Sequence, residues 1–70
     1  MPFRPRKRRD YERWIREYGW RLEKAGKDWK LVDGKGVTQV KNIIITHPGG
    51  EVIPLSIKKT EQALKDEGLL

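Results

Sequence analysis

The side chains best suited to bind a ligand are the basic ones at the start of the chain. Positions 1–9 read Met-Pro-Phe-Arg-Pro-Arg-Lys-Arg-Arg, with five basic residues and no acidic one. Cationic side chains neutralise phosphates and release counterions, which gives affinity for nucleic acid without sequence specificity. A solubilising tail is the alternative interpretation of the same composition. The basic residues concerned are Arg4, Arg6, Lys7, Arg8 and Arg9.

The excess positive charge is concentrated in this segment. The 70-residue chain has 16 Lys and Arg against 10 Asp and Glu, a net charge of +6. Positions 10–70 keep eleven basic and ten acidic residues, a net charge of only +1. Two prolines and like-charge repulsion predict that residues 1–9 form a flexible arm. A chain of this length has room for one domain, which we expect to span residues 10–70.

Two further clusters could contact nucleic acid. Lys58 and Lys59 lie at the start of a predicted helix, where positive charge opposes the helix dipole unless an anion binds there. A solvated helix face is the alternative. Trp29, between Lys27 and Lys30, could stack on a base or anchor a protein partner. Packing in the core is the alternative role of this tryptophan.

His47 is the one candidate for catalysis. An unperturbed imidazole pKa of about 6.5 suits a general base in RNA cleavage. However, His47 directly precedes Pro-Gly-Gly, and a residue at the start of a turn more often caps that turn. The chain has no cysteine and this single histidine, so we expect no metal site. It has no glycine-rich phosphate loop either, and we expect no cofactor.

The chain has no stretch near the roughly 18 apolar residues that span a membrane. Its basic N-terminus is not followed by the apolar segment of a secretory signal. We therefore expect a cytoplasmic protein that does not contact membranes.

An amphipathic helix is predicted to follow the basic segment. Asp10 is a suitable N-cap for a helix that begins at Tyr11, and Gly19 is a suitable stop. Its apolar residues recur at helical spacing, so they form one buried face. They are Tyr11, Trp14, Ile15 and Tyr18.

Alternating apolar residues predict strands at 20–25 and 28–32, joined by a turn at Gly26-Lys27. Further strands are predicted at 37–46 and 51–55, around a type II turn at His-Pro-Gly-Gly. The run Ile43-Ile44-Ile45 favours a central strand covered on both sides, at least in part. If its edge is exposed, the strand would favour a homodimer. Pro54 would place the returning strand at a sheet edge.

The last helix is predicted to be capped by Ser56 or Thr60 and to stop at Gly68. The predicted fold class is therefore α+β: a helix, three or four antiparallel strands, and a second helix. Both helices are expected to pack on one face of the sheet.

Three short runs resemble the HicA (YcfA-type) family of small toxins. They are Gly19-Trp20-Arg21-Leu22, the segment from His47 to Leu55, and Ala63 to Leu69. The resemblance implies a fold like that of double-stranded-RNA-binding domains, RNA as the partner, and a place in a toxin–antitoxin system. In such domains, lysines that begin the last helix bridge phosphates across the major groove, which is the role implied for Lys58 and Lys59.

This chain lacks the histidine that the family uses for catalysis. In the family it lies in a Gly-Ser-His motif on the second strand, but neither Gly26-Lys27-Asp28 nor Lys41-Asn42-Ile43 contains a histidine. The leading hypothesis is thus a HicA-like RNA-binding module without ribonuclease activity. The alternative is a protein-interaction module, toxin–antitoxin-related or a phage-type effector that binds a host protein through Trp29. A third hypothesis is an active messenger-RNA interferase that depends on His47.

Overall fold

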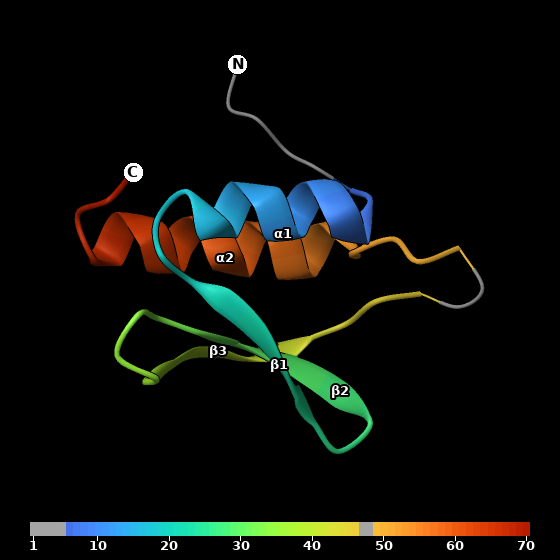
Figure 1. Ribbon diagram of the computed structural model, residues 1–70. Coiled ribbons are helices and arrows are strands. Elements are labelled where there is room, and N and C mark those ends of the chain that lie inside the picture. Colours follow the sequence, from blue (N-terminus) through green and yellow to red (C-terminus); the bar gives the residue numbers. More distant parts are fainter. Residues whose placement is uncertain (1–5, 47–48) are drawn as a thin grey trace.

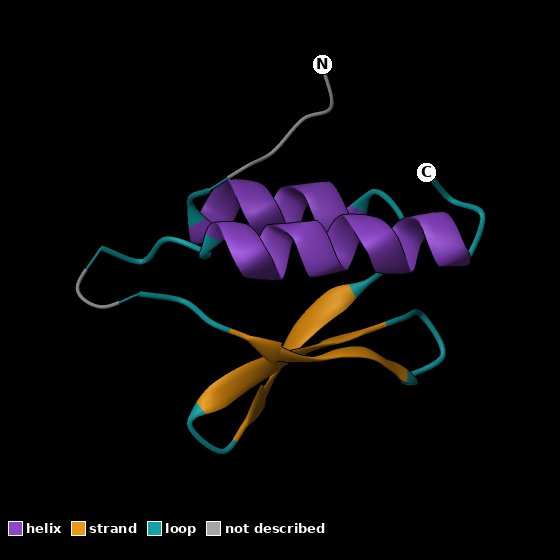
Figure 2. Cartoon of the chain, turned by 180° about the vertical axis from the view of Figure 1, so that it is seen from behind, coloured by secondary structure: helices purple, strands orange, loops and turns teal. Residues whose placement is uncertain are grey.

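Two helices lie side by side on one face of a three-stranded antiparallel sheet (Figure 1). The computed structural model describes residues 6–46 and 49–70. Its elements are α1 (Arg8–Arg16), β1 (Arg21–Ala25), β2 (Asp28–Val32), β3 (Thr38–Ile43) and α2 (Pro54–Asp66). The predicted α+β class, with both helices on one face, is confirmed. Seen from behind, the other face of the sheet carries no helix in the described part of the chain (Figure 2).

Helix α1 begins at Arg8, so the predicted start at Tyr11 is wrong by three residues. Asp10 lies in the first turn, where a carboxylate suits the helix dipole, and is not the N-cap. The chain before the helix is tied to a distant segment instead. The Arg8 amide donates to the Gly50 carbonyl (3.0 Å), and the Val52 amide donates to the Arg6 carbonyl (2.6 Å). Residues 6–9 of the predicted flexible arm are therefore part of the folded body.

Both helices end as the sequence predicts. Gly19 and Gly68 adopt positive φ angles of 78° and 74°. After each glycine, the next amide bonds back across the last turn, from Trp20 to Ile15 (3.0 Å) and from Leu69 to Leu64 (2.9 Å). This is the Schellman arrangement, which satisfies the carbonyls at a helix C-terminus.

The predicted hairpin of β1 and β2 is confirmed. Ala25 pairs with Asp28, which leaves Gly26 and Lys27 as a two-residue turn. The next turn, between β2 and β3, is organised by Asp33. Its carboxylate accepts bonds from the amides of Lys35 (2.8 Å) and Val37 (3.0 Å) and from the Gln39 side chain (3.0 Å). The bond from the Val37 amide is the main reason why the pKa of Asp33 is lowered.

Strand β3 is shorter than predicted and lies at an edge of the sheet. The sheet order is β1-β2-β3, and the strand ends at Ile43. Ile44 is exposed, and Ile45 makes one isolated bridge to Val52. The prediction of a long central strand is wrong, because the Ile44 amide leaves the sheet to bond the Ser56 hydroxyl (3.0 Å).

The predicted fourth strand at 51–55 is wrong because α2 begins within it. Pro54 opens α2 at its first position, where its fixed φ is favourable and its missing amide proton is not needed. Among the described residues, the expected pairing is reduced to the bridge from Ile45 to Val52 and its two backbone bonds, from Thr46 to Glu51 (2.8 Å) and from Ile53 to Ile44 (3.1 Å).

Ser56 and Thr60 are buried and are not helix caps. The Thr60 hydroxyl donates to the Ser56 carbonyl (2.8 Å), so it accepts the proton of the Tyr11 hydroxyl, 2.6 Å away. Burial raises the pKa of Tyr11 to about 12, although this bond opposes the shift. The contact fastens α1 to α2 within the apolar core. The buried core residues are Tyr11, Trp14, Ile15, Trp20, Leu31, Ile43, Val52, Ile57 and Leu64.

Candidate nucleic-acid interface

The two helices run in the same direction, so their N-termini lie at the same end of the molecule (Figure 1). We call this the open end: it comprises residues 6–10, the start of α2 at 54–59, and the β1–β2 hairpin tip at 24–29. The hairpin tip belongs to it because the Arg8 guanidinium carbon lies 4.2 Å from the centre of the Trp29 ring. Most of the basic residues predicted to bind nucleic acid are therefore at one end.

Trp29 is half-buried and packs against the core. Two cations lie over its ring: the Arg8 guanidinium and the Lys24 ammonium, whose Nζ is 4.9 Å from the ring centre. Such cation–π contacts are worth about 0.5–1 kcal/mol at exposed sites. A base that stacked on Trp29 would compete with these cations. The interpretation of Trp29 as partly a core residue therefore fits its surroundings better than that of a free stacking platform.

The start of α1 contributes three basic side chains, of which Arg8 lies over this ring. Lys7 and Arg9 are exposed, and Arg8 is half-buried. Arg8 also approaches Glu12, with 3.4 Å between Nε and Oε1. A partly exposed ion pair of this kind contributes little to stability. Lys7 and Arg9 thus present their charge to solvent.

The start of α2 is basic. Lys58 and Lys59 are exposed, and the first turn contains no acidic residue. No side chain among the described residues caps the helix, since Ile53 holds the N-cap position. Free amides, the helix dipole and two lysines thus all favour an anion at this place.

Of the other predicted contacts, Lys27 lies at the open end and Lys30 does not. Lys27 is exposed at the hairpin tip. Lys30 points away from the helices, because it lies between Trp29 and Leu31, which face them. Its Nζ is 3.9 Å from Glu23, which also pairs with Arg21 (2.7 Å). Lys30 is therefore separated from the open end. Arg4 and His47 lie outside the described residues.

Sequence reasoning missed Lys24 as a member of the cluster. Lys24 lies directly opposite Trp29 in the β1–β2 register, so it shares the helix-covered face of the sheet. The predicted two-residue turn at Gly26-Lys27 already implies this register, so the pairing of Lys24 with Trp29 could have been derived from the sequence.

The described residues contain no group of three or more His, Cys, Asp or Glu side chains that could hold a metal ion. Within the same residues, no helix is long and apolar enough to cross a membrane. The chain matches no known protein-family model, no curated protein and no solved structure. A functional proposal therefore has to come from the fold and its charges.

Proposed function

We propose that this protein is a small nucleic-acid-binding module, with RNA as the preferred ligand, and that it binds phosphates through its open end. The observation that carries the proposal is the parallel course of α1 and α2, which places the basic residues 6–9 and the start of α2, with Lys58 and Lys59, at the same end of the molecule (Figure 1). These residues lie 49 or more positions apart in the sequence.

The expected recognition is of shape more than of sequence. Basic side chains and helix N-terminal amides bind phosphates without identifying bases. Duplex RNA is recognised in this way, through the spacing of its phosphates and its 2′-hydroxyl groups. The helix–three strands–helix order and the resemblance to HicA toxins support a double-stranded-RNA-binding-domain-like use of the fold. We propose binding without cleavage, because the family's Gly-Ser-His motif is absent from the sequence.

A titration of fluorescently labelled duplexes tests this proposal. We would compare RNA and DNA of the same sequence, about 16 base pairs long, at about 50 and 200 mM salt. The double variant Arg9→Gln/Lys58→Gln removes one exposed cation from each helix start, so we expect at least a tenfold loss of affinity (about 1.4 kcal/mol). Its salt slope should also fall by about 2.

The matched control is Lys35→Gln/Lys65→Gln. It removes the same charge from the β2–β3 turn and the last turn of α2, at the opposite end. We expect it to bind like the unaltered protein. The proposal is wrong if the unaltered protein does not bind at low salt, or if both double variants lose affinity equally.

A protein-interaction module is the alternative, because Trp29 is only half-buried. It predicts a partner that survives nuclease treatment and is lost in Trp29→Ala. Binding of purified RNA that Trp29→Ala leaves intact would speak against it.

A further inference from the structure

We propose that a second copy of this chain docks against the outer edge of β3 and the neighbouring side of α2, to form a two-fold symmetric dimer. The inference does not depend on nucleic-acid binding, and of the two lysines at the start of α2 it uses Lys59 alone, which leaves Lys58 outside the groove and available to a phosphate. It starts from the position of β3 at the edge of the sheet. Among the described residues, no strand pairs with its outer side, although the Ser56 hydroxyl bonds the Asn42 carbonyl (3.5 Å) at its far end, and an open edge is a template for another strand.

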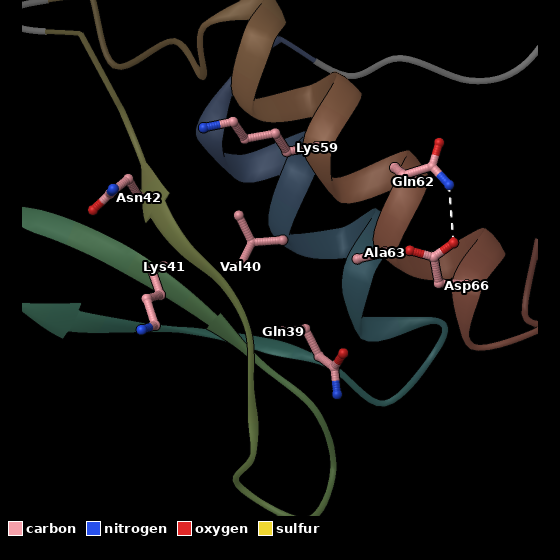
Figure 3. Close-up of a pocket in the computed structure, with 8 residues that line it drawn as sticks. All are labelled: Gln39, Val40, Lys41, Asn42, Lys59, Gln62, Ala63 and Asp66. Carbon is pink, nitrogen blue, oxygen red and sulfur yellow. Dashed lines mark hydrogen bonds between the residues drawn. The ribbon is translucent and has the colours of Figure 1, made fainter.

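A groove of about 350 Å³ runs between this edge and α2. Val40 projects from β3 toward the helix, whereas Lys41 and Asn42 point away from it (Figure 3). The groove is polar and contains charges of both signs. Its lining residues are Gln39, Val40, Lys41, Asn42, Lys59, Gln62, Ala63 and Asp66.

The helix side of the groove is self-complementary. Lys59, Gln62 and Asp66 follow one another along α2 at helical spacing, and all three are exposed (Figure 3). A two-fold axis near Gln62 reverses this order in the second copy. Lys59 then meets the partner's Asp66 at both ends of the contact. In the single chain, the Asp66 carboxylate accepts a bond only from the uncharged Gln62 amide among the described hydrogen bonds (2.9 Å).

The strand side fits the same symmetry. Antiparallel pairing centred on Val40 places Gln39 opposite the partner's Lys41, so no like charges face each other. The two sheets would then join into one of six strands. Mixed charge favours a second copy over an acidic peptide, because such a peptide would meet Asp66 at one end of the groove. The short edge predicts a weak dimer, at the small end of the range for specific interfaces.

Sedimentation equilibrium without nucleic acid tests the proposal. The mass should rise with concentration from 8.2 kDa toward twice that value. Lys59→Asp and Asp66→Lys each create two like-charge contacts, so each should weaken the dimer at least tenfold. Mixing the two variants pairs opposite charges at both ends, and the mixture should dimerise at least tenfold more tightly than either variant alone.

Lys65→Asp is the matched control: it makes the same charge change on an exposed residue of α2 that does not line the groove. It should dimerise like the unaltered chain. All three positions changed are on the surface, and circular dichroism would verify that each variant is folded. The proposal is overturned if the unaltered chain stays monomeric up to about 1 mM, if the two groove variants dimerise like the control, or if the mixture does not recover.

Discussion

The two ends of this molecule satisfy their helix termini in different ways. At the opposite end, which we call the closed end, Gly19 and Gly68 terminate both helices with backbone hydrogen bonds. The β2–β3 turn lies there too, and Asp33 accepts its amide protons. At the open end, neither helix has a side-chain cap among the described residues, and cations occupy positions near both N-termini.

This difference assigns stability to one end of the molecule and candidate ligand binding to the other. An end whose polar groups are satisfied within the chain gains stability and has little left to offer a ligand. An end whose helices lack side-chain caps and carry surplus cations forgoes some stability, and it recovers that stability when an anion binds. The same asymmetry explains why the net charge of the whole chain is a poor guide to where a ligand would bind.

Gly19→Ala should have the largest effect and would damage the closed end. A φ of +78° strains any residue with a Cβ, so we expect a loss of about 1–2 kcal/mol in the free energy of unfolding. Gly49→Ala is the control, because Gly49 does not adopt a positive φ and an added Cβ would make ordinary contacts. Urea denaturation measures both. Equal losses would contradict the interpretation.

Tyr11→Phe should loosen the contact that holds α1 to α2 near the open end. Losing the bond to Thr60 should cost about 1 kcal/mol. The variant should also change the pH dependence. Because the Tyr11 pKa is raised from 10.0 to about 12, its contribution is present below pH 10 and is lost as the pH rises toward 12. The stability difference between the two proteins should therefore shrink over that interval in thermal melts.

Leu55→Glu should change stability and RNA binding in opposite directions. Leu55 is 57% exposed in the first turn of α2. A carboxylate there should stabilise the helix by about 0.3–1 kcal/mol and repel phosphate. We expect a higher melting temperature and weaker RNA binding, and Leu55→Gln separates charge from lost apolar surface. If RNA binding is unchanged, the start of α2 is not part of the interface.

Asp33→Asn should have the smallest effect. Its hydrogen bonds hold the pKa of Asp33 below the usual value, so its contribution is present at neutral pH and declines as the pH falls below about 4. The variant should melt slightly earlier at pH 7 than the unaltered chain, and the two should converge in acid. RNA affinity at pH 7 should stay the same, because the β2–β3 turn lies at the closed end.

The local elements could be predicted because their signals are local. The apolar face of α1, the stop at Gly19 and the β1–β2 hairpin each depend on residues within one or two turns of each other. The start of α1 could not be predicted in this way. It depends on the bond from Arg8 to Gly50, across more than 40 residues. The early end of β3 likewise depends on Ser56, which a local pattern identifies only as a possible cap.

The sequence by itself determined an α+β domain with a basic N-terminal segment, because periodicity, glycine positions and charge are properties of the chain. Only the tertiary structure decided that residues 6–9 belong to the folded body and that the starts of α1 and α2 share one end. The physical reason is the odd number of antiparallel strands between the helices. After three such strands the chain is back at the end where α1 begins, so α2 runs alongside α1 in the same direction. Charges that are far apart in the chain thereby come to the same end.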